Sequence, residues 1–324
     1  MAVEMDQLHD TTTSRAAKDQ RRAGAGAPAI ETKGLTKTYG AMVAVDHLSL
    51  TVNRGEIFGF LGPNGAGKTT TMRMLLGLIR PSSGSATVLG MDIASRLPEI
   101  LAHTGAMIEN PTFYPYLSGY DNLRAMARLT GTRVSRVTDV LDQVQLTGAA
   151  ARRFKTYSLG MKQRLAVGAA LLHNPDLLIL DEPANGLDPA GIVEMRDLMH
   201  GLKAEGHTVL ISSHVLHEIE QICDRIAILN RGRVVVQGRV ADLLGGRDVL
   251  EVRVDPLEEA ERVLASAFGE AVSRSGDRLL VALPQARAAD VTRILAGHGL
   301  YLSGMQAQEQ SLEQYFLDVT GDRR

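Results

Sequence analysis

The stretch of sequence that decides the fold reads Ile57-Phe58-Gly59-Phe60-Leu61-Gly62-Pro63-Asn64-Gly65-Ala66-Gly67-Lys68-Thr69-Thr70. Its first five residues form an apolar run typical of a buried strand, and residues 62–69 match the phosphate-loop pattern G-x-x-x-x-G-K-[ST]. After this pattern, large apolar residues recur at helical spacing, namely Met72, Leu75, Leu76 and Ile79. We therefore expect a helix that Pro81 ends. A strand, a glycine-rich loop and a helix in this order predict a nucleotide-binding α/β core.

The phosphate loop (residues 62–69) carries the groups that hold the phosphates of a nucleotide. Its glycines allow successive backbone N–H groups to point inward, and the following helix N-terminus adds positive potential. Lys68 is expected to reach the β- and γ-phosphates, and the Thr69 hydroxyl is expected to ligate Mg²⁺. The other candidate nucleotide contacts are Gly62, Pro63, Asn64, Gly65, Ala66, Gly67 and Thr70. An accidental glycine-rich turn is the alternative, and a chance match is expected about once in a hundred chains of this length.

Polar and acidic residues follow two further apolar runs. Asp181 and Glu182 come directly after Leu177–Leu180, and His214 follows residues 208–212. Because open α/β sheets bind ligands at the carboxyl ends of their strands, Asp181 is a candidate for holding Mg²⁺ and Glu182 for orienting or polarising the attacking water. His214 is a candidate contact to the γ-phosphate. Taken alone, the two acids could equally solvate a strand end and the histidine could be incidental, but the phosphate loop favours the functional interpretation.

Composition and charge exclude several classes of protein. The 324 residues carry a formal net charge of −2, so no overall basic field indicates a nucleic-acid partner. The single cysteine, Cys223, excludes an internal disulfide and a four-cysteine zinc site, and suits a reducing cytoplasm. No apolar stretch reaches the roughly 20 residues that span a bilayer, and the N-terminus lacks the apolar core of a secretory signal. We therefore expect a protein that does not cross a membrane by itself.

Composition also divides the chain into three parts. Residues 1–29 have almost no large apolar side chains and are predicted to form a disordered tail. Residues 30–244 are predicted to form an α/β domain with a mostly parallel sheet, because short apolar runs such as residues 226–229 alternate with helical patterns. Short β segments between residues 30 and 52 predict a β subdomain, broken at Gly34, Gly40 and residues 53–55. A helical insertion without clear strands is expected at about residues 98–168.

The C-terminal part of the chain has a different pattern of apolar and polar residues. Asn230-Arg231-Gly232 is a hairpin turn signal that closes the first domain. Residues 245–324 are predicted to form a small α+β accessory domain. Its expected strands cover residues 248–254 and 278–283, and its expected helices cover residues 258–268, 286–296 and 311–319.

A fourth motif completes a recognisable set. Ser158-Leu159-Gly160-Met161-Lys162-Gln163-Arg164 begins a predicted helix upstream of the two acids. Over about residues 30–240 the order of motifs resembles the ATP-binding cassette (ABC) family, which implies a phosphate-loop NTPase core with an antiparallel β subdomain and a helical insertion. The resemblance implies that Ser158 and Gly160 donate to the γ-phosphate of an ATP held by the opposite subunit, which suits a helix N-terminus. The usual L-S-G-G-Q reads Y-S-L-G-M here, so Leu159 and Met161 depart from the family.

Three more residues match positions of the family. Tyr39 matches the aromatic that stacks on adenine, although a lone tyrosine is also compatible with core or surface packing. Asp188 matches the loop that bridges the two subunits, and Asp before Pro189 is also a helix N-cap, so both roles can coexist. Glu109 stands where the family usually has a glutamine that touches Mg²⁺ and water. A carboxylate keeps the oxygen ligand but adds a charge beside the metal.

The resemblance extends to one branch of the family. Glu109, residues 184–192 and the tail at residues 311–321 are similar to the bacitracin, lantibiotic and daunorubicin export branch, whose permease is a separate polypeptide. Aromatic residues in the segment 110–116 fall where the family receives the permease's cytoplasmic helices, although a packed loop is an equal alternative.

The family resemblance implies an ATP-hydrolysing subunit that works in pairs. Two copies sandwich two ATP molecules and energise a separate integral membrane permease, which exports a drug, peptide antibiotic or lipid, so the chain would lie on the cytoplasmic face of the cell membrane. One alternative is a non-transport ABC ATPase that acts on ribosomes or DNA, but those relatives typically carry two cassettes, a coiled-coil linker or zinc motifs, which this sequence lacks. Another is a weakly hydrolysing nucleotide switch, which Glu109 favours.

Overall fold

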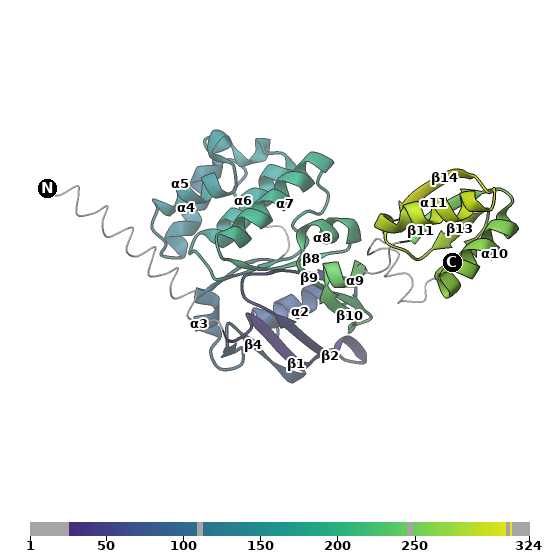
Figure 1. Ribbon diagram of the computed structural model, residues 1–324. Coiled ribbons are helices and arrows are strands. Elements are labelled where there is room, and N and C mark those ends of the chain that lie inside the picture. The colour runs from purple at the N-terminus through teal and green to yellow at the C-terminus, as the bar shows by residue number, and fades with distance from the viewer. Residues whose placement is uncertain (1–25, 109–112, 245–248, 309–311, 313–324) are drawn as a thin grey trace. The chain divides into compact units, whose positions relative to one another are not determined.

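The computed structural model describes residues 26–108, 113–244, 249–308 and 312. These residues form two compact units that divide between Gln237 and Gly238 (Figure 1). The composition of the sequence predicts this boundary after residue 244 instead. The predicted N-terminal tail, apart from its last four residues, and the predicted helix at 311–319, apart from Leu312, lie outside the described residues.

A six-stranded sheet forms the centre of the first unit. Its strand order is β10-β9-β3-β8-β7-β6, and the pairs β3–β8, β3–β9, β7–β8 and β6–β7 are parallel. The strands are β3 (Ile57–Leu61), β6 (Thr104–Met107), β7 (Leu177–Leu180), β8 (Thr208–Ser213), β9 (Arg225–Asn230) and β10 (Arg233–Arg239). The predicted mostly parallel sheet is confirmed, because buried strands of this kind read as short continuous apolar runs.

Strand β6 corrects one expectation. It lies inside the segment 98–168 that was predicted to hold no clear strand. Its sequence is Thr-Gly-Ala-Met, which lacks the branched apolar residues by which buried strands are recognised. Gly105 is required there, because a Cβ at this position would overlap the carbonyl oxygen of Ala170 on the neighbouring helix. The close approach of the neighbouring helix to β6, rather than β propensity, therefore explains the glycine in this strand.

The predicted hairpin turn joins β9 to β10. Arg231 and Gly232 both have positive φ, 49° and 81°, as the two central residues of a type I′ turn require. The turn is tied to the phosphate loop, because the Gly232 N–H donates to the Ala66 carbonyl oxygen at 3.0 Å. The edge hairpin thus supports the loop from the side.

A second sheet is antiparallel, with the order β2-β1-β4-β5. Its strands are β1 (Ile30–Tyr39), β2 (Met42–Val52), β4 (Ser83–Val88) and β5 (Met91–Asp92). Gly34 does not break β1, as the sequence analysis expected, but lies where the register with β2 shifts between Thr32 and Leu35. A bulge of this kind uses a residue with positive φ without ending the strand.

Helix α2 (Lys68–Leu75) packs between the two sheets (Figure 1). It ends before the predicted stop at Pro81, because Gly77 adopts φ 67°. The Gly77 N–H donates to the Met74 carbonyl and the Leu78 N–H donates to the Arg73 carbonyl, which is the Schellman pattern of a helix end. A glycine C-cap, and not the proline, terminates this helix.

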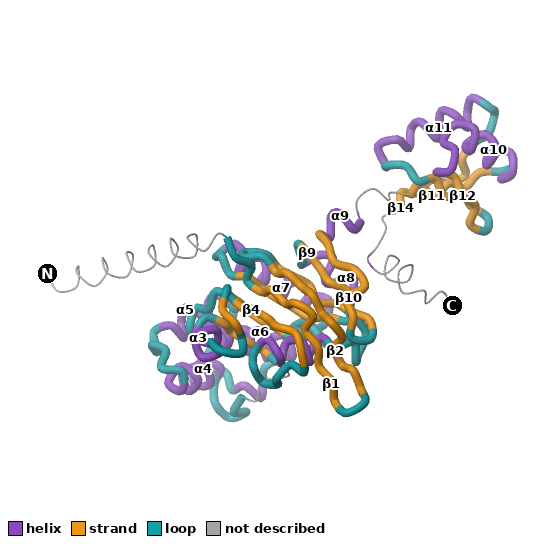
Figure 2. Tube along the Cα trace, turned by 90° about the horizontal axis from the view of Figure 1, so that it is seen from below, coloured by secondary structure: helices purple, strands orange, loops and turns teal. Residues whose placement is uncertain are grey.

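Helices α4 to α8 gather on the other side of the six-stranded sheet, as Figures 1 and 2 show. Helix α3 stays on the side of α2, where its Ile100 joins the core between the two sheets. Helices α4, α5 and α6 contact one another and form the predicted helical region, and α7 and α8 pack against the sheet. Their bounds, with the short α3, are α3 (Leu97–Ala102), α4 (Gly119–Leu129), α5 (Arg136–Gln143), α6 (Leu159–Leu171), α7 (Pro189–Ala204) and α8 (Leu216–Ile222). Among the described residues, no helix is both long enough and apolar enough to span a bilayer.

The second unit starts at Gly238, near the end of β10, and its first helix is α9 (Val240–Leu244). It continues in the order βαββαβ around its own apolar core. Its sheet has the order β12-β13-β11-β14, with antiparallel pairs. The elements are β11 (Val249–Val254), α10 (Leu257–Phe268), β12 (Val272–Ser275), β13 (Arg278–Val281), α11 (Ala288–Gly297) and β14 (Leu302–Gln308). The sequence pattern predicts β11, β13 and both helices but neither β12 nor β14.

Substitutions at two glycines test the packing of β6 against α6. Gly105→Ala is expected to lower the free energy of unfolding by about 1–3 kcal/mol, because the added methyl group collides with backbone that cannot move freely. Gly201→Ala in α7 is the matched control, since nothing lies within 4 Å of its Cβ position. That change should instead raise stability by about 0.5–1 kcal/mol through helix propensity. Urea unfolding measures both, and equal effects of the two changes would contradict the close helix–strand approach.

Candidate active site

The phosphate loop leaves β3 and enters α2 in a conformation that only glycine adopts readily. Gly65 and Gly67 have φ values of 80° and 104°. A Cβ on Gly67 would lie 2.7 Å from the Ala44 carbonyl oxygen, and one on Gly62 would overlap the carbonyl oxygen of Leu229. The loop backbone therefore packs closely against the end of β9 on one side and against β2 on the other, and this packing fixes its conformation.

Lys68, the first residue of α2, folds back over this loop. Its side chain is almost fully buried, and its ammonium donates to the carbonyl oxygens of Gly62 at 2.7 Å and Pro63 at 3.4 Å. The ammonium also lies 3.4 Å from Oε1 of Glu182. A buried charge needs such partners, because its loss of hydration is costly. The positive charge is thus held at the mouth of the loop, where phosphate oxygens would meet it.

Asp181 joins three elements at the carboxyl edge of the sheet. Its Oδ2 accepts a hydrogen bond from the Thr69 hydroxyl of α2 at 2.7 Å, and its Oδ1 accepts one from the Ser212 hydroxyl at the end of β8. A threonine hydroxyl and a carboxylate are the oxygen donors that Mg²⁺ prefers. The pair therefore offers the donor atoms that the predicted metal position needs. In this structure the Thr69 hydroxyl and the Asp181 carboxylate bond directly to each other.

Glu182 points away from Asp181 because its backbone turns. Its φ is 51°, the left-handed region, which costs a non-glycine residue about 1–2 kcal/mol. The Glu182 N–H donates to Ser212 Oγ at 3.0 Å, which stabilises this turn. Its carboxylate then lies between two basic groups, with Oε2 2.5 Å from Nδ1 of His214 and Oε1 beside Lys68. A carboxylate held in this way can orient a water molecule and accept its proton.

The structure thus brings together five of the predicted residues: Lys68, Thr69, Asp181, Glu182 and His214. Ser212 belongs with them and was not predicted. It is fully buried and bonds both acids, through the Asp181 side chain and the Glu182 backbone. Its only sequence signal is its place just before Ser213 and His214 at the end of an apolar run.

The predicted signature residues lie on a different element. Ser158 is the N-cap of α6, is exposed, and accepts a hydrogen bond from the Met161 N–H at 3.2 Å. Within the described part of the chain, its hydrogen bond stays inside its own helix turn and does not reach the phosphate loop. Leu159, which departs from the family, points toward the neighbouring loop, since a Cβ on Gly186 would lie 3.2 Å from its Cδ2. Gly160 faces Leu187 of the same loop.

Asp188 and Tyr39 belong to other elements than the acids. Asp188 is the N-cap of α7 and accepts a hydrogen bond from the Gly191 N–H at 3.0 Å, with Pro189 at the first helical position. Tyr39 ends β1 and is 45% exposed, so it is a surface residue and not part of the core. The Lys37 ammonium lies 5.0 Å from the centre of its ring. Glu109 lies outside the described residues.

The aromatic segment that precedes α4 divides into buried and exposed residues. Phe113 is buried, with its ring centre 5.0 Å from that of Phe154. Tyr114 and Tyr116 are 67% and 75% exposed. One aromatic thus anchors the loop, and two present their rings to solvent; docking of a permease on this segment stays a prediction.

Comparison with known proteins agrees with these features. The profile of the family described as "ABC transporter" matches residues 45–185. The chain is 40% identical to the uncharacterized ABC transporter ATP-binding protein YhcH of Bacillus subtilis over 91% of this chain and 97% of that protein. It is 39% identical to the bacitracin transport ATP-binding protein BcrA of Enterococcus faecalis (90% and 96%), and 36% identical to the daunorubicin/doxorubicin resistance ATP-binding protein DrrA of Streptomyces peucetius (90% and 92%).

Solved structures show the same cassette. The structure of cbiO1 from Clostridium perfringens, part of the ABC transporter complex cbiONQ, superposes with a TM-score of 0.63 at 27% identity, covering 67% of this chain and 90% of that chain. An ATP-binding subunit of an ABC transporter superposes with a TM-score of 0.58 at 32% identity, covering 66% and 91%. The chain therefore belongs to the ATP-binding subunits of the ABC transporter family, the ATPases that hydrolyse ATP to power transport.

Proposed function

We propose that Glu182 positions the hydrolytic water in this ATPase, and that two copies of the chain close over Mg-ATP to drive a separate permease. The observation that carries the proposal is the continuous set of contacts from Lys68 through Glu182 to His214, beside Thr69 and Asp181. These groups supply a cation for the phosphates, oxygen donors for a metal and a carboxylate for water within one sheet edge.

The residues present fit a Mg²⁺ ion bound with ATP. Thr69 and Asp181 would hold it, and Mg²⁺ when bound supplies positive charge that stabilises the phosphate oxygens. Lys68 binds the same phosphates from the loop side. For Glu109, which lies outside the described residues, the resemblance to the family alone supports a role as a further oxygen ligand. Residues 62–67 and Thr70 supply further contacts to the phosphates, and Tyr39 offers an exposed ring on which adenine can stack.

Glu182 and His214 have different roles, one toward the attacking water and one toward the γ-phosphate. The Glu182 carboxylate orients the attacking water and receives its proton. His214 holds that carboxylate by its hydrogen bond and can contact a γ-phosphate oxygen. Because Ser212 fixes both Asp181 and the Glu182 backbone, metal and water would keep a constant spacing.

The proposed partner in the site is a second copy of the chain. One chain carries one phosphate loop and one signature segment, and Ser158 lies exposed at a helix N-terminus, where an anion is favoured. In the dimer, Ser158 and Gly160 of one copy would face the γ-phosphate bound by the other, and Asp188 would lie at the junction. The site is completed only when the two copies meet.

The proposed permease exports a drug, peptide antibiotic or lipid. Relatives named for bacitracin transport and daunorubicin/doxorubicin resistance support this choice. The protein would lie on the cytoplasmic face of the cell membrane through its permease, with no nucleic acid partner. Tyr114 and Tyr116 are exposed aromatic anchors for that interface.

Glu182→Gln tests the assignment of the water-positioning residue. The amide cannot accept the proton, so kcat for ATP hydrolysis should fall by about 10²–10⁴-fold while the Kd for Mg-ATP changes little. Lys68→Ala is the contrasting variant and should weaken Mg-ATP binding by about tenfold or more, because a charged hydrogen bond to phosphate is lost. Phosphate release and equilibrium binding are the measurements. A Glu182→Gln protein as active as the parent would overturn the assignment.

Two substitutions at Ser158 test the composite dimer. Ser158→Asn and Ser158→Asp both keep an N-cap for α6, so the helix should remain intact. In a Glu182→Gln background, light scattering should show a Mg-ATP-dependent dimer for Ser158→Asn. Ser158→Asp should remain monomeric, because its carboxylate would face phosphate charge across the interface. Equal dimerisation of the two variants would contradict the placement of Ser158 against the partner's nucleotide.

The permease interface is tested with exposed tyrosines. The variant with Tyr114→Ser and Tyr116→Ser should lose most co-purification with an integral membrane protein identified by mass spectrometry, because aromatic anchors dominate interfaces. Tyr301→Ser in the second unit, equally exposed, is the control and should behave as the parent. Both variants should hydrolyse ATP normally without the permease. Unchanged co-purification of the double variant would exclude this surface.

A further inference from the structure

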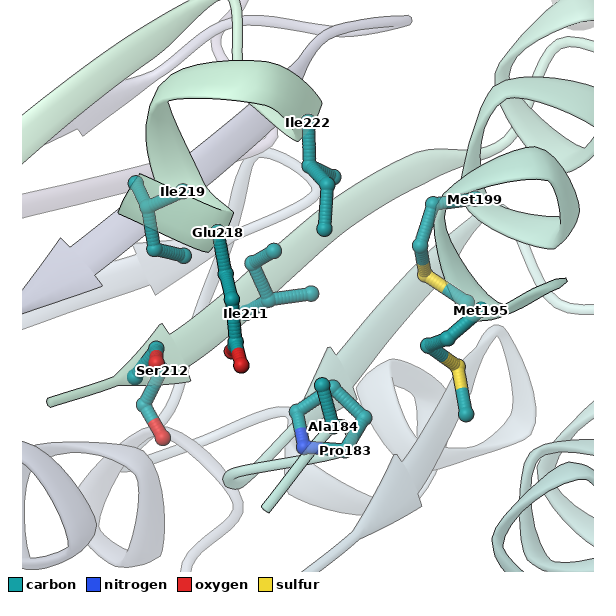
Figure 3. Close-up of a pocket in the computed structure, with 10 residues that line it drawn as sticks. Pro183, Ala184, Met195, Met199, Ile211, Ser212, Glu218, Ile219 and Ile222 are labelled. Carbon is teal, nitrogen blue, oxygen red and sulfur yellow. The ribbon is translucent and has the colours of Figure 1, made fainter. Parts of the chain in front are cut away.

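The cavity next to the two acids is too small to admit a partner molecule. It lies between α7, α8 and the end of β8, and its volume open to the centre of a water molecule is about 10 Å³, enough for one water. Figure 3 shows Met195 and Met199 of α7 facing Glu218 and Ile222 of α8 across this space. A second protein therefore contacts exposed side chains of the first unit, and not this cavity.

Two chain segments, residues 114–118 and 152–157, lie side by side where they lead into α4 and α6. Three backbone contacts join them, namely from the Lys155 N–H to the Pro115 carbonyl oxygen at 3.0 Å, from the Phe154 N–H to the Leu117 carbonyl oxygen at 2.9 Å, and between Ser118 and Arg153 in an antiparallel bridge. The two segments therefore form one structural piece, which we call the two-segment platform.

Aromatic rings attach one side of the two-segment platform to the rest of the helical region. The ring centre of Phe154 lies 5.0 Å from that of Phe113 and 5.8 Å from that of Tyr157. Tyr157 is buried, and its hydroxyl donates to the Ala149 carbonyl oxygen at 2.8 Å. The exposed side chains of the platform therefore stand on a backbone whose position is fixed.

The exposed side chains of the platform are basic and aromatic. Arg152, Arg153 and Lys155 are all exposed. The Lys155 ammonium lies 5.1 Å from the ring centre of Tyr116, which is exposed together with Tyr114. Three cations and two aromatic rings thus meet the solvent on one short stretch of paired backbone.

The cations of the platform lack acidic partners. In the described parts of the chain, Arg152, Arg153 and Lys155 form no ion pair with a carboxylate. Asp121, at the start of α4, already pairs with Arg124 at 2.9 Å. Because the whole chain carries a net charge of −2, this excess of positive charge is local. Such a surface favours a partner of opposite charge.

We propose that the two-segment platform docks a cytoplasmic segment of the permease that carries carboxylates. Tyr114 and Tyr116 pack against this segment, and Arg153 and Lys155 pair with its acids. The inference rests on the proposed function, which supplies the permease, and it adds the chemistry of the segment that is recognised.

The residue types of the platform favour a protein over a lipid surface as the partner. Tyrosine and arginine are enriched at protein interfaces. Anionic membrane surfaces are bound instead by longer clusters of lysine and arginine, next to a membrane span or on an amphipathic helix. The platform also leads through the buried Tyr157 directly into Ser158, so a bound permease segment would lie beside the signature segment.

A zero-length carbodiimide cross-linker tests the proposal on the intact complex, because it joins an amine to a carboxylate only where the two are in contact. Lys155 should become joined to an aspartate or glutamate in a cytoplasmic segment of the co-purifying integral membrane protein, as identified by mass spectrometry of the linked peptides. Lys155→Arg keeps the charge but has no reactive amine, so it should keep the permease and lose the cross-link. Absence of the cross-link from the parent complex would overturn the inference.

Charge reversal measures what the cations contribute. The variant with Arg153→Glu and Lys155→Glu should retain about tenfold less permease, because like charges would then meet. Its ATP hydrolysis without the permease should match the parent, since only the backbone of these residues joins the two segments. The variant with Arg128→Glu and Arg133→Glu, exposed at the other end of α4, has the same change in charge and is the control that should behave as the parent. Equal losses in the two variants would contradict a specific platform.

Salt gives an independent measurement on the parent. Capture of the permease should fall as the salt concentration rises from about 0.1 M to about 1 M, because the Debye length shortens from about 10 Å to about 3 Å. The charge-reversed variant should show little further loss over the same range. Capture by the parent that does not depend on salt would count against an acidic partner.

The remaining outcomes separate this inference from the proposed function. If the parent captures no integral membrane protein, the proposed function itself fails. If the parent and the charge-reversed variant capture the permease equally, only the acidic nature of the docking segment fails. Binding of the parent to protein-free phosphatidylglycerol vesicles, lost on charge reversal, would assign the platform to lipid headgroups and overturn the inference.

Discussion

The hydrogen bonds of Asp181 hold the site together. Strands β3, β8 and β7 are neighbours and parallel, so the segments that leave their carboxyl ends meet at one edge. Asp181 follows β7 and bonds Thr69, at the end of the phosphate loop that follows β3, and Ser212, the next-to-last residue of β8. One carboxylate therefore fixes the phosphate loop relative to the rest of the sheet, and the spacing of every other group at the site follows from it.

The backbone strain of this arrangement lies at Glu182, whose φ is positive. Neighbouring acids in a strand would point to opposite faces of the sheet, away from a common ligand. The positive φ of Glu182 breaks that alternation, and Ser212 and the buried Lys68 stabilise the result. The lysine in turn needs the glutamate, because its ammonium is nearly inaccessible to water. The Lys68 ammonium, the Glu182 carboxylate and the His214 imidazole thus stabilise one another. Their contacts therefore do not require a bound phosphate.

The parts of the structure that the sequence predicted are those with a strong local signal. Strands β3, β7 and β8 are continuous apolar runs, and the acids that end β7 are conspicuous after four buried residues. Strands β6 and β12 were missed, because Thr-Gly-Ala-Met and Val-Ser-Arg-Ser owe their conformation to neighbouring elements. Ser212 was missed for a related reason, since a serine at a strand end acquires its role only from residues far away in the chain. Gly77 shows that a cap two residues past a helix outweighs a more obvious proline.

The separation of Ser158 from the acids has a mechanical consequence in the proposed dimer. The Ser158 turn is not isolated within its own chain, because Leu159 packs toward Gly186 and Gly160 toward Leu187. That loop begins at Glu182, whose carbonyl oxygen accepts a hydrogen bond from the Asn185 N–H at 3.1 Å, and it ends at the Asp188 cap. A displacement of Ser158 toward a partner's nucleotide would therefore pull on the loop that carries this chain's own water-positioning carboxylate. The leucine in place of the family's glycine strengthens that contact by filling the space beside Gly186. Closure at one nucleotide would in this way be sensed at the other through packing alone, with no charged group required between them.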